Sequence, residues 1–113
     1  MRKDDVVKNI CTELKASGDI SDFAYDHFKA NREIDLPFVV YRRVAPDTFS
    51  ADGVTYHRGS NVDLELYASD ADEMAELMDT VETALDTAEL FYRITADTVY
   101  LDSEEMYETL YEL

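Results

Sequence analysis

The sequence has little cysteine, glycine or proline. Its single cysteine, Cys11, cannot form an internal disulfide, and nothing pairs with it at the spacing of zinc ligands. Only three glycines and two prolines interrupt a chain that is 46% hydrophobic and 12% aromatic, and this composition excludes a disordered protein. Cys11 falls on the apolar side of a predicted helix, so we expect a buried thiol without chemistry.

Long apolar runs are also absent. No stretch approaches the roughly 18 consecutive apolar residues that a membrane span needs. The start of the chain, Met1 to Asp5, lacks the apolar run of a signal peptide. At 113 residues the chain has room for one domain, residues 1–113. We therefore expect a soluble, cytoplasmic, single-domain protein without membrane contacts.

Basic residues are scarce in the second half of the chain. Residues 62–113 carry 16 acidic residues and one basic residue, Arg93, whereas residues 1–61 carry 10 acidic and 9 basic residues. Because nucleic-acid affinity rests on lysine and arginine, we expect no direct sequence-specific binding of nucleic acid. The acidic half fits four other roles: binding a basic partner, mimicking nucleic acid, lining a channel for DNA, or adaptation to a halophilic host.

Apolar residues at helical spacing predict two helices. The first covers about residues 4–15 and is ended by Gly18. The second begins at Ser69 or Asp70, because Asp70 and Glu73 have the spacing of a capping box and a continuous apolar stripe follows.

The remaining segments have strand character. Strands are predicted over 36–44, which should be central in the sheet, and over 54–57 and 62–66. Residues 20–32 fit a short strand or a turn of helix, and we prefer an extended segment. Strands are also predicted over 90–94, 98–101 and 106–113, although the last of these also fits a helix. This order predicts an α+β two-layer sandwich, in which an antiparallel sheet of about four or five strands carries both helices on one face.

Candidate catalytic and metal-binding residues are few. The two histidines, His27 and His57, fall in different predicted elements, and neither has a metal-ligand neighbour two to four residues further on. The acidic run from Asp70 to Glu73 is explained by helix capping rather than by cation binding. No glycine-rich phosphate loop or nucleophile elbow occurs. We expect no enzyme, no metal site and no cofactor.

Three features fit contact between subunits. Arg42, Arg43 and Arg58 form the main basic cluster and can meet an acidic neighbour, although ion pairs within one subunit explain them equally well. Tyr56 and Tyr67 are candidate interface residues, because eight tyrosines exceed the needs of one core, although β-propensity also explains them. Alternation points Tyr67 away from the face of Leu64 and Leu66. The second helix has an acidic face without basic partners, which fits solvation, lumen lining or partner binding: Asp72, Glu73, Glu76, Asp79, Glu82 and Asp86.

Hydrophobic patterns over residues 20–113 resemble those of a known group of proteins. The segments that carry the resemblance are Tyr25-Asp26-His27-Phe28, Leu36-Pro37-Phe38-Val39-Val40-Tyr41, Phe49-Ser50-Ala51-Asp52-Gly53 with Tyr56, Asp63-Leu64-Glu65-Leu66-Tyr67, Leu90-Phe91-Tyr92, and Met106-Tyr107 to Leu110-Tyr111-Glu112-Leu113. They resemble the tail-completion, or tail terminator-like, proteins of long-tailed phages and prophages, which are related in fold to the minor tail protein U group.

The resemblance implies a two-layer α+β subunit that forms a homo-oligomeric ring, often a hexamer. Such a ring caps the tail tube protein, stops its polymerisation and joins it to head-tail connector proteins. The expected location is the virion tail, or the host cytoplasm during assembly. In a ring the interface is heterologous, so the near-neutral half of one copy can face the acidic half of the next.

A second function remains open. An acidic DNA mimic could occupy the basic cleft of a nuclease or repressor with the acids of residues 62–113. A mimic acts as a monomer or dimer, whereas a terminator forms closed rings, so self-association distinguishes the two.

Overall fold

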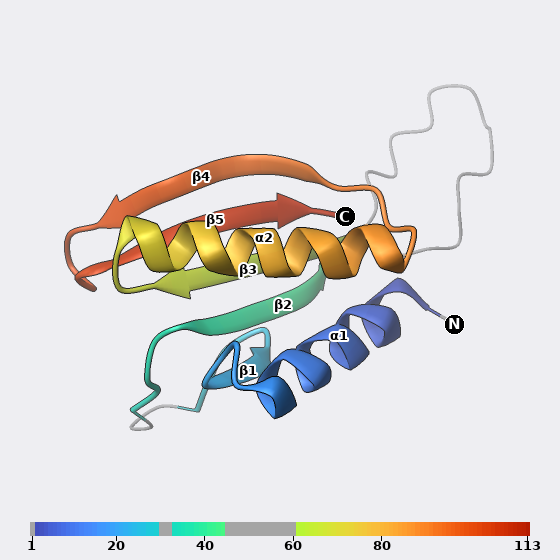
Figure 1. Ribbon diagram of the computed structural model, residues 1–113, viewed down its shortest axis with the longest axis horizontal. Helices are drawn as coiled ribbons and strands as arrows, with labels where there is room; N and C mark the ends of the chain where they lie inside the picture. Colours follow the sequence, from blue (N-terminus) through green and yellow to red (C-terminus); the bar gives the residue numbers. More distant parts are fainter. Residues whose placement is uncertain (1, 30–32, 45–60) are drawn as a thin grey trace.

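The computed structural model describes residues 2–29, 33–44 and 61–113, which form two helices and five strands. In chain order the elements are α1 (Lys3–Ser17), β1 (Asp22–Tyr25), β2 (Phe38–Val44), β3 (Asn61–Ala68), α2 (Ala71–Thr87), β4 (Arg93–Leu101) and β5 (Met106–Glu112). Both helices lie on the same face of one sheet, and their buried residues share a core with the strands (Figure 1). The expected α+β two-layer architecture is confirmed.

Helix α1 buries one side and ends at a glycine. Its buried residues have the spacing of one helical face: Val7, Ile10, Cys11 and Leu14. Gly18 follows in the left-handed conformation, with φ at 84°, and its N–H points back to carbonyls of the last turn. Residues with a Cβ are strained in this conformation, whereas glycine adopts it freely, so helix α1 ends at Gly18, as predicted.

Helix α2 begins with the predicted cap. The Asp70 carboxylate accepts a hydrogen bond of 2.7 Å from the backbone N–H of Glu73, and the Glu73 carboxylate accepts one of 2.8 Å from the backbone N–H of Ser69. These two bonds fix the start of the helix. The helix then packs over β3 and β5 through four buried residues: Met74, Leu77, Val81 and Leu85.

The sheet is mixed, and the expectation of an antiparallel sheet is wrong at β1. The strand order is β1-β2-β3-β5-β4, with β1 parallel to β2 and every other pair antiparallel. Residues 26–37 connect β1 to β2. A connection of about a dozen residues is long enough to return the chain to the end at which β1 began, so the two strands run in the same direction. The extended segment preferred within 20–32 is confirmed as β1.

Strand β3 occupies the centre of the sheet. Val62, Leu64 and Leu66 are buried under the helices, while Tyr67 lies on the opposite face, as the alternation predicts. Strand β2, expected to be central, lies one place from the edge because β1 is added outside it. The predicted strand over 54–57 lies outside the described residues.

The end of the chain forms a hairpin of two long strands. The predicted strands over 90–94 and 98–101 are one strand, β4, whose pairing with β5 shifts register between Ile94 and Val99. Leu90 is not in a strand, because its N–H bonds the carbonyl of Leu85 at 2.9 Å and closes the end of α2. Residues 106–112 form strand β5 rather than a helix, because β3 and β4 pair with both of its edges. Neither described helix is long and apolar enough to cross a membrane.

Candidate functional site

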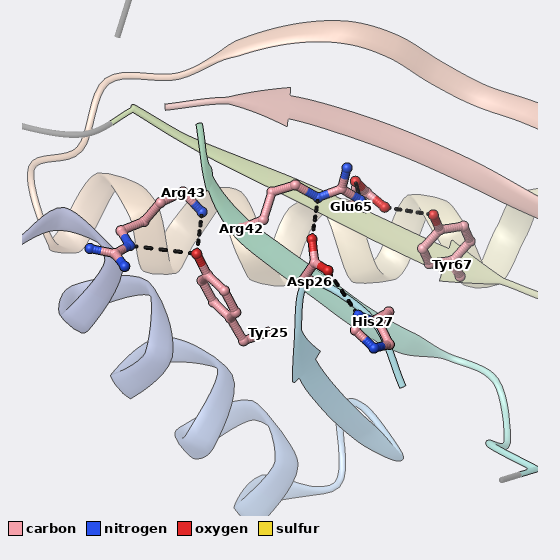
Figure 2. Close-up of polar contacts among 7 residues, drawn as sticks. All are labelled: Tyr25, Asp26, His27, Arg42, Arg43, Glu65 and Tyr67. Carbon is pink, nitrogen blue, oxygen red and sulfur yellow. Dashed lines mark hydrogen bonds and ion pairs between the residues drawn. The ribbon is translucent and has the colours of Figure 1, made fainter. Parts of the chain in front are cut away.

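The two predicted arginines on β2 do not form one basic cluster. Arg42 and Arg43 are consecutive in a strand, so their side chains leave opposite faces of the sheet. Figure 2 shows Arg42 directed towards Glu65 and Asp26, while Arg43 meets Tyr25 near α1. The alternative explanation, ion pairs within one subunit, therefore describes both residues. The third member of the predicted cluster, Arg58, and the predicted interface residue Tyr56 lie outside the described residues.

Arg42 belongs to a network on the face of the sheet opposite the helices. Its guanidinium donates a hydrogen bond of 2.5 Å to Glu65, whose side chain is largely buried, and lies 3.7 Å from the Asp26 carboxylate. Glu65 also accepts a bond of 2.8 Å from the Tyr67 hydroxyl. Glu65 therefore joins an arginine and a tyrosine, and this largely buried carboxylate has two donors to stabilise its charge.

Tyr67 is held in place on this second face of the sheet, the one opposite the helices. Its ring stacks on Phe38 with the centroids 4.9 Å apart, and Phe28 meets Phe38 edge-on at 5.3 Å. Burial raises the pKa of the Tyr67 phenol, and hydrogen bonds to Glu108 and Glu65 raise it further. The phenol thus keeps its proton and acts as a hydrogen-bond donor to carboxylates. These rings and carboxylates line a groove of about 400 Å³ on the second face.

Asp26 and His27 follow β1 in a tight turn. Asp26 has a φ of 69°, and the N–H of His27 bonds the carbonyl of Tyr25 at 2.8 Å across it. The turn brings the Asp26 carboxylate to 2.8 Å from Nδ1 of His27 and to 3.7 Å from Arg42 (Figure 2). His27 is exposed, and its partner is this carboxylate rather than a nucleophile.

Arg43 connects the edge strand β1 to helix α1. The Tyr25 hydroxyl accepts hydrogen bonds from the backbone N–H of Arg43 at 3.2 Å and from its Nε at 3.5 Å, and these bonds lower the pKa of Tyr25. Nε of Arg43 also lies 3.7 Å from Asp4 on α1. The Tyr25 ring is 46% exposed despite these contacts.

The six acidic residues predicted as one face of α2 divide into two groups. Glu73 completes the helix cap, and Glu82 accepts hydrogen bonds from Tyr92 at 3.0 Å and from Tyr111 at 2.7 Å. These two carboxylates are half-buried and act within the fold. The other four are exposed along the helix: Asp72, Glu76, Asp79 and Asp86.

The thiol and the metal-ligating residues add no reactive centre among the described residues. Cys11 is buried, and desolvation raises the pKa of its thiol to about 12, so the thiolate that reacts is not formed near neutral pH. The described residues contain no group of three or more histidine, cysteine, aspartate or glutamate side chains placed to hold a metal ion.

Searches among known protein families, curated proteins and solved structures found no match to this chain.

Sequence reasoning missed the partners of Arg42. Asp26 lies in the turn after β1 and Glu65 lies on β3, and only the pairing of β2 with β3 brings Glu65 beside the arginine. A signal was present, because alternation places Arg42 and Glu65 on one face once those two strands are paired.

Proposed function

We propose that this chain is a structural assembly subunit of a long-tailed phage or prophage, a tail terminator or completion protein whose copies form a closed ring. One observation carries the proposal. The large hydrophobic side chains that remain exposed among the described residues lie at the two ends of the sheet: Tyr25 on β1, and Phe91, Ile94, Val99 and Tyr100 on β4 or just before it. Apolar side chains at both ends suit a subunit with a neighbour on each side.

The charge of the chain supports the same proposal. Residues 62–113 hold 16 of the 26 acidic residues, and four of these lie exposed along α2. A ring with acidic surface towards its opening lets DNA pass without adhering, because like charges repel. The ring would cap the tail tube protein and present its other side to head-tail connector proteins.

The proposal is tested by the mass of the purified protein in solution. We expect sedimentation to show a closed oligomer that forms between micromolar and millimolar concentration, and electron microscopy to show rings. Added to a polymerising tail tube protein, the ring should bind tube ends and shorten the tubes. A chain that stays at the 13.0 kDa of one subunit at every concentration and leaves the tubes unchanged would contradict the proposal.

A second candidate is an acidic DNA mimic, and the exposed carboxylates along α2 favour it. Asp72, Glu76 and Asp79 follow one another at helical spacing and have no basic residue beside them on α2. A mimic would bind a basic DNA-handling enzyme one to one as a monomer or dimer, and duplex DNA would compete with it. The same sedimentation experiment distinguishes this outcome from a ring.

A further inference from the structure

The β4 end of the molecule is the edge of the sheet formed by β4 and the turn after it. It has an apolar surface that α2 leaves uncovered. Helix α2 packs mainly over β3 and β5, so the helix side of β4 extends beyond it (Figure 1). Ile94 and Tyr100 lie opposite Tyr111 and Tyr107 in register and stay 38% and 47% exposed, while Val99 on the other face is 45% exposed. A neighbouring molecule can therefore remove apolar surface from water on both sides of this strand.

The edge of β4 favours contact through side chains rather than through an added strand. Its pairing with β5 shifts register on both sides of Ala96, and Thr98 has a φ of 51°. Such irregularity at an edge interrupts the regular row of backbone donors and acceptors that a further strand needs.

The β4 end is also strongly acidic. Exposed carboxylates follow along the strand and the turn after it: Asp97, Asp102, Glu104 and Glu105. The one basic residue of this half, Arg93, is already paired with Glu112. A partner for this end should therefore bring positive charge with its apolar surface.

The opposite end, formed by β1 and the adjoining side of α1, carries an exposed basic residue and an exposed aromatic ring. Lys8 lies on the same stripe of α1 as Asp4 and Lys15, whose side chains reach Arg43 on β2 and Asp22 on β1. Lys8 is therefore directed towards the β1 end, and it is exposed and forms no ion pair with another described residue. Tyr25 adds an exposed aromatic ring on β1, at the same edge of the sheet.

We infer that the β4 end of one copy binds the β1 end of the next copy, head to tail. The inference rests on the proposed ring and names its interface: the neighbour covers Ile94, Val99 and Tyr100 with a surface that includes its Tyr25, and the carboxylates of the β4 end attract its Lys8. Because the two surfaces differ, the contact is heterologous, and such contacts generate rings when they close.

Two variants, each blocking one end, test the inference. Val99→Glu with Tyr100→Ser removes most of the apolar surface of the β4 end, leaving Ile94, and adds negative charge to it. Lys8→Glu with Tyr25→Ser does the same to the β1 end, and Lys8→Glu alone serves if the double variant does not fold, as judged by circular dichroism. The matched control is Lys3→Glu, which makes the same change of charge on a different side of α1.

We expect each blocked variant to sediment alone as a monomer, with assembly weakened at least tenfold, while Lys3→Glu assembles like the unmodified protein. An equimolar mixture of the two variants retains one complete interface. It should give a single one-to-one complex of about twice the 13.0 kDa of one subunit.

Three results would overturn the inference. A dimer formed by the β1-end variant alone would show a symmetric contact between β4 ends. Rings formed by both variants as readily as by the unmodified protein would place the interface elsewhere and leave the proposed ring intact. An unmodified protein that never assembles would remove the proposed function together with its interface.

Discussion

The carboxylate of Glu82 makes a measurable contribution to stability, because it joins α2 to the sheet through two phenols. Its two oxygens accept hydrogen bonds from Tyr111 at 2.7 Å and from Tyr92 at 3.0 Å. Tyr111 is fully buried, so water cannot replace its hydroxyl as the donor in Tyr111→Phe. Hydrogen bonds to charged groups contribute about 1.5–3 kcal/mol, and we expect Tyr111→Phe to lower the free energy of unfolding by about 2 kcal/mol.

The half-buried Tyr92 should matter less, and Tyr92→Phe should cost about 1 kcal/mol. A chain of 113 residues has an entropy of unfolding of about 240 cal/mol/K, so the expected losses in Tm are about 8 °C for Tyr111→Phe and about 4 °C for Tyr92→Phe. Differential scanning calorimetry measures both values. The control is Tyr100→Phe, which removes an exposed hydroxyl and should leave Tm unchanged.

A double-mutant cycle isolates the interaction itself. In a Glu82→Leu background the further change Tyr111→Phe should cost nothing or even stabilise, because the hydroxyl has already lost its acceptor. The reasoning is refuted if Tyr111→Phe changes the free energy of unfolding by less than about 0.5 kcal/mol, or if its cost is the same with and without the Glu82 carboxylate.

Three further predictions concern pH, backbone conformation and thiol reactivity. Burial raises the pKa of Cys11 above the ordinary 9.0, and burial with neighbouring carboxylates raises the pKa values of Tyr67 and Tyr111 above the ordinary 10.0. The folded protein therefore holds these protons at a pH where the unfolded chain loses them, so urea midpoints should begin to fall near about pH 9 and fall more steeply above about pH 10, and a rise would contradict the sign. Gly18→Ala should destabilise by about 1 kcal/mol in urea unfolding, because the left-handed φ of 84° strains alanine although its Cβ would meet no atom; an unchanged midpoint would mean that the turn relaxes freely. Cys11 should react with a thiol reagent only at the rate of unfolding, and rapid modification of the folded protein would disagree with its burial.

The helices and the inner strands could be predicted because their signals are local. The capping residues Asp70 and Glu73 are three positions apart, and the alternation in β3 lies within a single strand. The parallel direction of β1 could not be predicted in this way, because it depends on how β1 pairs with β2 and not on a local pattern. The merging of two predicted strands into β4 also depends on pairing with β5, which the order of residues does not state.

The candidate surfaces were harder to predict than the fold. Glu82 looked like an exposed acid on a helix because nothing near it in the sequence is a donor, yet Tyr111 reaches it from β5. Arg42 and Arg43 looked like one cluster because they are adjacent, and the pleat of β2 separates them. In both cases the side chains are recognised correctly by type, but the packing of distant elements and the pleat of a strand decide which of them remain free for a partner.

The position of β5 between β3 and β4 has a consequence for synthesis on the ribosome. Strand β4 is made before β5 and pairs with no other described strand, so it must wait in the nascent chain until its partner emerges. Until then the side of β3 that pairs with β5 also lacks its hydrogen-bond partner along most of its length. A nascent chain halted after α2 would display an unfinished sheet whose edge can capture another strand, and chaperones would be expected to engage the chain at that stage.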